Sequence, residues 1–188
     1  MNRRNFILGL GASTAGAVVT IGSGAFTSVE ADREVSVEVV DDTDAYLSPV
    51  PLDDNGEVPD DPSDNDQLRV PGAQDEPYAQ IDNDTGRLIL TFGALNSEAT
   101  TRISQVFRVT NEGDDEVGLW FEVSGSSPDV VTFTDQDGNE LNDGSENAVD
   151  LTVGESVDVD IEFDTSGVGP DDEIIDTITL NADQEVAS

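Results

Sequence analysis

Three oxygen-bearing side chains alternate around one glycine: Asp135, Asp137 and Asn139 surround Gly138. Carboxylate and amide oxygens at alternate positions are the ligands that Ca²⁺ takes in proteins. In an EF-hand loop glycine takes the sixth position and a bidentate glutamate the twelfth, whereas Gly138 is fourth here and Glu146 is twelfth. An Asp-Gly step equally favours a plain hairpin turn. The sequence therefore leaves two alternatives, a calcium site and a turn.

Histidine and cysteine are absent from the chain. A Ser-His-Asp or Cys-His nucleophile, a zinc site built on histidines and any disulfide are thereby excluded. Paired carboxylates are available by number, but glycosidase chemistry needs two whose surroundings separate their pKa values. The sequence singles out no such pair, so we expect a protein that is not an enzyme, with no catalytic residue and no cofactor besides possible calcium.

One Asn-x-Thr sequence, Asn83-Asp84-Thr85, matches the acceptor motif for N-linked glycans. In an exported protein such an asparagine accepts a glycan when it lies at the surface. Asn83 is therefore a candidate glycosylation site.

Acidic residues outnumber basic ones by 42 to 7, and the net charge of −35 makes self-repulsion the main electrostatic problem of the compact chain. Concentrated salt shortens the screening length to ~3 Å at 1 M and removes most of that repulsion. All basic residues are arginines, a composition typical of proteins from salt-loving archaea. The arginines after residue 26 are scattered singly, so we expect neither nucleic acid nor an anionic membrane surface as a partner.

Residues 1–25 resemble a twin-arginine (Tat) signal peptide, because Arg3 and Arg4 precede a run of apolar and small residues from Phe6 to Ile21. The Ser-Gly-Ala sequence ending at Ala25 suits signal peptidase, and cleavage there makes Phe26 the first mature residue. The resemblance implies export by the Tat machinery to the cell surface or medium. The alternative is an uncleaved anchor, the one route by which the chain would hold a membrane, but this run is shorter than the ~17–25 residues that span one.

The mature chain, residues 26–188, reads as one acidic domain in which apolar residues recur with period two. The clearest case is Val157, Val159, Ile161 and Phe163, which alternate with acidic residues. Short alternating runs separated by glycine-containing turns predict an all-β fold, an antiparallel β-sandwich of jelly-roll or immunoglobulin-like type. Six of the eight prolines fall between about 48 and 77, which predicts a long exposed loop there.

Two blocks carry a family resemblance: the junction Gly22-Ser23-Gly24-Ala25-Phe26-Thr27-Ser28, and Thr101 to Gly113, which ends in Asn-x-Gly. Together they resemble the TasA/camelysin group of secreted proteins. The resemblance implies a jelly-roll filament subunit whose mature N-terminal segment, here with Phe26 and Val29, inserts as a strand into the next subunit. Camelysin-type proteolysis does not fit, because no histidine is present to hold zinc.

Two functions follow as expectations. The first is a secreted structural protein that associates with itself into cell-surface or biofilm filaments by exchanging a strand. The alternative is a monomeric surface-binding module that holds calcium or a glycan through its acidic loops. The particle size of the mature protein in multimolar salt separates the two, because filaments are larger than a single chain and a monomeric module is not.

Overall fold

The computed structural model describes residues 28–29, 33–39, 47–70, 77–84, 87–92, 95–96, 98–142, 144–168, 175 and 177–187, and of 28–29, 33–39 and 96 the backbone alone. The signal-peptide prediction for 1–25, with Arg3, Arg4 and Ala25, and the predicted new terminus Phe26 lie outside these residues.

The described chain consists of strands and short 3₁₀ turns. Its strands are β1 (Ser28–Val29), β2 (Arg33–Val39), β3 (Leu47–Pro51), β4 (Ala79–Ile81), β5 (Leu88–Phe92), β6 (Leu95–Asn96), β7 (Thr100–Asn111), β8 (Val117–Ser124), β9 (Val131–Asp135), β10 (Val149–Leu151), β11 (Ser156–Asp164) and β12 (Thr177–Asp183). The 3₁₀ turns are η1 (Asn65–Gln67), η2 (Pro128–Val130) and η3 (Ser145–Asn147). In these described segments no helix is long and apolar enough to cross a membrane. The all-β prediction is confirmed.

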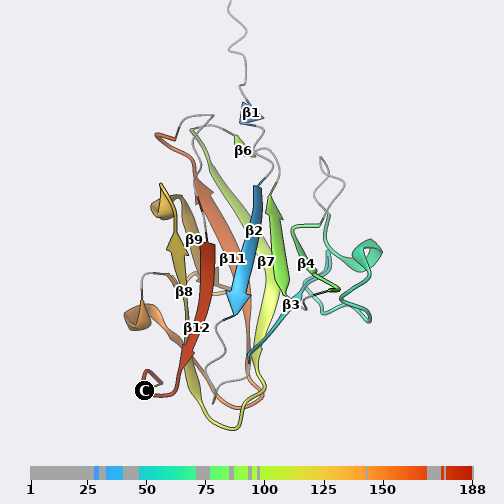
Figure 1. The fold of residues 1–188 in the computed structure, drawn as a ribbon, viewed down its shortest axis with the longest axis vertical. Helices are drawn as coiled ribbons and strands as arrows, with labels where there is room; N and C mark the ends of the chain where they lie inside the picture. Colours follow the sequence, from blue (N-terminus) through green and yellow to red (C-terminus); the bar gives the residue numbers. More distant parts are fainter. Residues whose placement is uncertain are drawn as a thin grey trace, which may run out of the picture.

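Two large sheets share one core. The six-stranded sheet has the order β10-β8-β12-β2-β5-β4 and the four-stranded sheet the order β3-β7-β11-β9, while β1 and β6 form a separate pair. Figure 1 shows β2 and β12 of the first sheet in front of β7 and β11 of the second. The pairings are antiparallel except that of β12 with β2, which is parallel.

Aromatic side chains join the two sheets. The rings of Phe92 in β5 and Phe163 in β11 meet edge to face with centroids 4.6 Å apart. Phe121 in β8 stacks on Phe133 in β9 at 4.4 Å and meets Phe107 in β7 at 6.0 Å. The alternation read from the sequence produces this arrangement, because alternate residues of a strand point to one face, and those faces form the core.

The irregular part of the proline-rich region starts later than predicted. Residues 47–51 form β3, an edge strand paired with β7, so the irregular segment begins at Leu52 rather than near residue 48. Leu52 donates its N–H to Val106 O of β7. The N–H groups of successive residues in a strand point to opposite sides, so positions 50 and 52 face β7 and positions 49 and 51 face away from it. Pro49 and Pro51 therefore occupy positions whose N–H would point away from β7. Proline is tolerated at such edge positions because no ladder bond is lost. Leu52 and Leu68 are buried, which ties the segment to the body.

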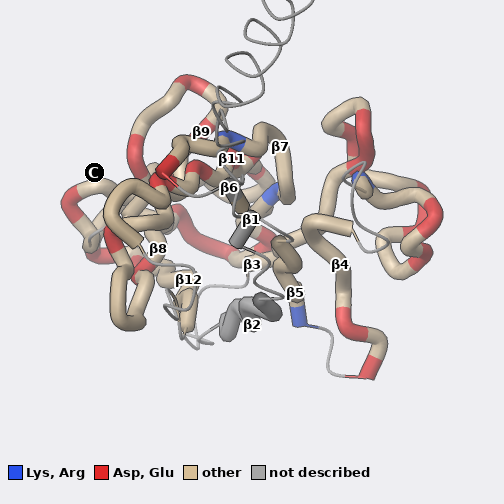
Figure 2. Tube along the Cα trace, turned by 90° about the horizontal axis from the view of Figure 1, so that it is seen from above, with Lys and Arg blue, Asp and Glu red and all other residues tan. Residues whose placement is uncertain are grey.

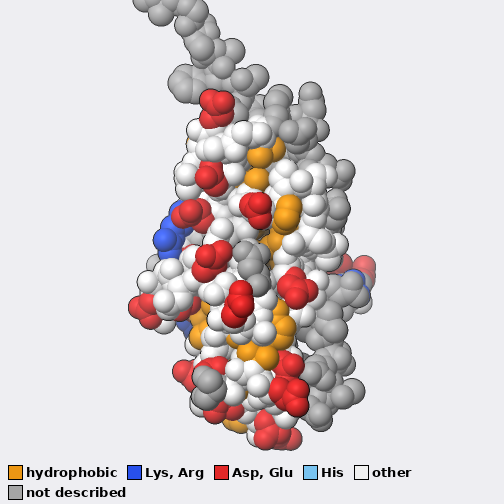
Figure 3. Space-filling model, turned by 90° about the vertical axis from the view of Figure 1, so that its left-hand side faces the viewer, with side chains coloured by type: hydrophobic (Ala, Val, Ile, Leu, Met, Phe, Trp, Pro, Cys, Tyr) orange, Lys and Arg blue, Asp and Glu red, His pale blue; other side chains and the backbone are white. Residues whose placement is uncertain are grey.

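The surface carries acidic side chains on every side that the figures show. Figure 2, a trace of the backbone coloured by residue type, shows acidic positions along the turns around the molecule and few basic ones. Figure 3 shows carboxylates spaced apart over one face with small apolar areas between them. The spacing limits direct repulsion between neighbours and leaves the overall charge to salt screening.

Candidate functional site

The N-terminal strand β2 lies in the middle of the larger sheet. It pairs antiparallel with β5, Val35 opposite Leu90, and parallel with β12, Val37 opposite Ile178. Figure 1 shows β2 and β12 running side by side in the same direction. Since β5 and β12 do not pair with each other, β2 fills a slot between them. A strand close to the chain start therefore completes a sheet built by much later residues.

The segment singled out for strand exchange, residues 26–31, is only partly described. Its residues Ser28 and Val29 form β1, which pairs with Leu95 and Asn96 of β6 in the same chain. The side chain of Val29 and all of Phe26 lie outside the described atoms. Contact of this segment with another copy stays a prediction.

The free edges of the four-stranded sheet are blocked in two ways. At β3, Pro49 and Pro51 remove the outward N–H groups that another strand would need. At β9, the buried Asn142 imitates a paired strand: its Oδ1 accepts the N–H of Phe133 at 2.7 Å and its Nδ2 donates to Val131 O at 2.8 Å. The prolines and Asn142 therefore leave each edge with fewer backbone partners for a further strand.

Asn142 also connects the two sheets. Its neighbour Leu141 donates to Phe133 O of β9 at 2.9 Å and accepts from the N–H of Phe121 of β8 at 2.7 Å. One short segment thus forms backbone bonds to both sheets along this side of the molecule. Nothing in the sequence pattern indicated this role, because a single asparagine in a turn region carries no distinguishing signal.

The predicted calcium loop is a hairpin turn held by one carboxylate. Asp135 Oδ1 accepts the N–H groups of Asp137 and Asn139 at 2.9 and 2.8 Å, and its Oδ2 accepts the Asn139 amide Nδ2 at 2.6 Å. Burial raises the pKa of Asp135, but these hydrogen bonds outweigh it and the net shift is downward. These bonds are those of the turn alternative. Calcium binding at Asp135, Asp137 and Asn139 stays a prediction.

The proline-rich region repeats this turn. Asp53 Oδ1 accepts the N–H groups of Asn55 and Glu57 at 2.8 and 2.9 Å, and Gly56 occupies the same place as Gly138, both with positive φ (75° and 86°). The bond from Glu57 is the main cause that lowers the pKa of Asp53. An Asp-x-Asx-Gly-x sequence thus uses an ionised aspartate as an internal acceptor. Part of the acidity of this chain holds turns together.

The Asn-x-Gly turn at the end of β7 is built on a fully buried asparagine. Asn111 Oδ1 accepts the N–H of Gly113 at 2.9 Å, and its Nδ2 donates to Asp115 O at 2.8 Å and to Leu151 O at 2.9 Å. Its backbone N–H donates to Glu155 O at 2.9 Å, and its backbone C=O accepts the N–H of Gly154 at 2.8 Å, both at the neighbouring turn. Asn111 therefore joins two turns at one end of the molecule and has a structural role in the Asn-x-Gly turn.

Asn83, the candidate glycosylation site, lies exposed in the turn between β4 and β5. Its neighbour Asp82 accepts the N–H of Asp84 at 2.7 Å, which fixes the turn. The asparagine is reachable from solvent, as the motif requires, and its modification stays a prediction.

A bulge in β7 and two arginine–aspartate pairs mark the outer face of the smaller sheet. The register of β7 with β11 shifts between Val159 and Ile161, and Gln105 there has φ 54°. Asp160 accepts the Gln105 N–H at 2.8 Å and Arg102 Nη2 at 2.9 Å. Nearby, Asp158 pairs with Arg108, and its hydrogen bond raises the arginine pKa. Sequence reasoning missed this cluster, because the bulge interrupts the alternation on which strand prediction depends.

No described group of three or more acidic side chains is placed to hold a metal ion. Comparison with protein-family models, with curated proteins and with solved structures finds no match to this chain.

Proposed function

We propose that this protein is the subunit of an extracellular filament and that its copies are joined by exchange of the N-terminal strand. The supporting observation is the position of β2, which occupies the slot between β5 and β12 although it lies near the start of the chain. If β2 of one copy fills the slot of the next, each copy both gives and receives a strand. A head-to-tail contact grows into a fibre when successive copies do not close into a ring.

The proposal moves the exchanged element from residues 26–31 to β2 together with the residues before it. Phe26 and Val29 then accompany β2 into the neighbouring copy. The blocked edges at β3 and β9 favour this choice, because an incoming strand finds its backbone partners in the slot rather than along those edges. Main-chain hydrogen bonds on both sides of β2 supply the affinity.

The remaining expectations belong to the same proposal. We infer a β-sandwich of the class that includes jelly-roll and immunoglobulin-like domains, a TasA-like role, Tat export and a mature chain that starts at Phe26. The net charge of −35 implies that copies approach one another only where concentrated salt screens them. The facing sheets joined by Phe92 and Phe163 support the sandwich.

The test uses the absence of cysteine from the chain. A Ser36→Cys, Ile89→Cys double variant places one cysteine in β2 opposite one in β5. If β2 is exchanged, oxidation in concentrated salt links successive copies, and a non-reducing gel shows a ladder. A matched control, Thr110→Cys with Ser156→Cys, places its pair across β7 and β11, whose hydroxyls are 2.8 Å apart. The control should give monomers only, and monomers in both variants after complete oxidation would overturn the proposal.

A further inference from the structure

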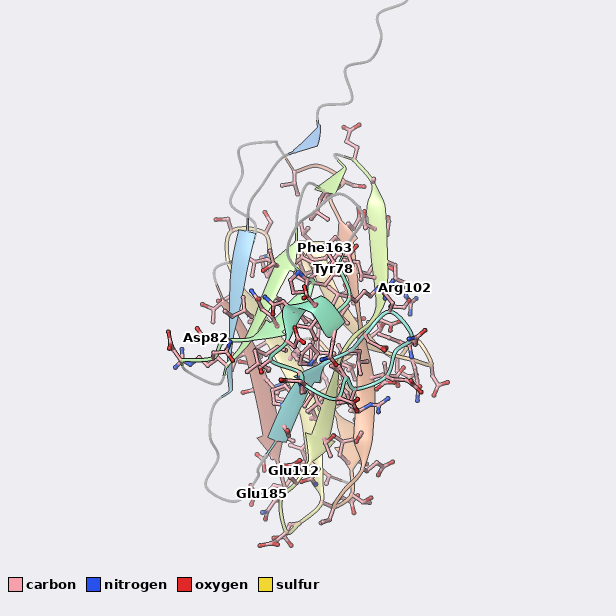
Figure 4. All side chains as sticks on the ribbon, turned by 90° about the vertical axis from the view of Figure 1, so that its right-hand side faces the viewer. Tyr78, Asp82, Arg102, Glu112, Phe163 and Glu185 are labelled. Atoms are coloured by element: carbon pink, nitrogen blue, oxygen red, sulfur yellow. The ribbon has the colours of Figure 1, made fainter. Side chains whose placement is uncertain are left out.

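Residues 52–70, here called the strap, cross the side of the molecule between the edge strands β3 and β4. Figure 4 faces this side, with the strap in front of the sheets and Tyr78 and Phe163 near its centre. The strap is an irregular segment, yet it makes specific contacts with both sheets.

On the four-stranded sheet the strap contacts the β7 bulge. Leu52 donates its N–H to Val106 O at 3.2 Å, and the Arg69 guanidinium donates to Ser104 O. Gly56 packs so closely on the Gln105 amide that an added Cβ would lie 2.6 Å from it. Three successive residues of the bulge therefore touch the strap, which explains why the strand departs from regular geometry there.

On the six-stranded sheet the strap contacts the β4–β5 hairpin. Tyr78 donates its N–H to Arg69 O at 3.1 Å, and the Arg69 guanidinium lies 5.8 Å from the centre of the Tyr78 ring. Asn65 donates to the Gln80 side chain at 3.0 Å. Arg69 is the one residue in these contacts that touches both sheets.

The β4–β5 hairpin forms one wall of the slot that β2 fills, since β5 pairs directly with β2. The hairpin is held by β2, by the strap and by Phe92, whose ring meets Phe163 of the other sheet. In the proposed exchange the hairpin moves away from β12 as β2 leaves or enters, and this movement strains the strap contacts.

We propose that the strap is a latch that controls exchange of β2, with Arg69 as its main link; this inference rests on the proposed function. Its contacts suit concentrated salt, because Arg69 bonds a neutral carbonyl and an aromatic ring at short range, and screening acts mainly on separated charges. A closed latch keeps β2 in its own copy, and an open one lets the slot take the strand of another.

The test compares Arg69→Ala with Gln67→Ala, a strap substitution whose side chain bonds Asp64 within the strap. The hairpin amides of Thr91 and Asp82, which bond Tyr78 O and Arg87 O, report its opening by hydrogen exchange. We expect these amides to exchange roughly tenfold faster in Arg69→Ala, a change equal to about 1.4 kcal/mol. The Phe121 amide, bonded to Leu141 O on the far side of the molecule, should not change and shows that the variant is folded.

The Ser36→Cys, Ile89→Cys background supplies the second readout, the rate at which mixed copies form a disulfide ladder. Arg69→Ala should raise this rate by a similar factor, and Arg69→Lys should fall between it and the wild type. Unchanged hydrogen-exchange protection of the Thr91 and Asp82 amides in Arg69→Ala overturns the latch whatever the ladder shows. The latch is also overturned if the hairpin opens faster while a ladder forms at the wild-type rate. Faster hairpin opening with no ladder in any variant overturns the filament instead, and leaves restraint of the hairpin by the strap established.

Discussion

Asp160 holds the backbone of Gln105: its carboxylate accepts the Gln105 N–H at 2.8 Å in the middle of the β7 bulge. The second oxygen of the same carboxylate accepts Arg102 Nη2 at 2.9 Å. Asp160 is 4 % exposed. One buried acidic group thus stabilises a non-glycine residue with positive φ, a conformation that costs free energy on its own.

Replacing Asp160 by alanine should therefore destabilise the fold. Loss of the acceptor leaves the Gln105 N–H without its partner, and a hydrogen bond to a charged group contributes about 1.5–3 kcal/mol. We expect the free energy of unfolding to fall by roughly that amount, measured by urea denaturation at constant salt. Glu162→Gln, two residues along the same strand, is the control and should change the urea midpoint little. Equal urea midpoints for both variants would show that the β7 bulge is stable without the hydrogen bond from Gln105 to Asp160.

Acid should lower the stability of the protein as pH falls below about 3.8. The pKa values of Asp53, Asp61, Asp135 and Asp164 lie below this ordinary value in the folded chain, because their carboxylates accept hydrogen bonds, mostly at turns. A lowered folded-state pKa adds stability above the unfolded value and loses it as pH falls through the folded one. Thermal melts in concentrated salt from pH 7 to pH 2 should show a flat region and then a decline below pH 4. A melting temperature that rises on acidification would mean that charge repulsion outweighs these bonds.

Asn142 is expected to be sensitive to substitution. Its side chain satisfies a buried N–H and a buried C=O of β9, and leaving buried polar groups unpaired costs about 1–3 kcal/mol each. Asn142→Leu should lower the free energy of unfolding by several kcal/mol. Asn83→Leu, in an exposed turn, serves as control and should stay close to the wild type. Circular dichroism melts in concentrated salt measure both.

The sequence predicted the strands whose pattern is local. Val157, Val159, Ile161 and Phe163 alternate with acidic residues and are buried in β11 as expected. The placement of β2 between β5 and β12 could not be read in the same way, because strand order depends on contacts between residues far apart in the chain. The turn at Asp135 was one of two alternatives for a similar reason: alternating Asp and Asn side chains suit a turn and a cation, and the sequence does not show which backbone groups the carboxylate meets.

The edge prolines supply the last prediction. Pro49 and Pro51 lie at positions of β3 whose N–H groups would face away from β7, so they deprive the edge of donors that a second copy could use. Threonine at both positions restores the donors and suits a strand. We expect Pro49→Thr, Pro51→Thr to associate side by side through β3 in concentrated salt, seen as a rise in light scattering with concentration. Pro128→Thr, at the start of η2 and outside the strap, is the control and should scatter like the wild type. The new contact should also leave the Ser36→Cys, Ile89→Cys ladder unchanged, because it forms at an edge that the exchange of β2 does not involve. An unchanged particle size for the β3 variant would mean that charge repulsion, and not proline, prevents a second copy from pairing with β3.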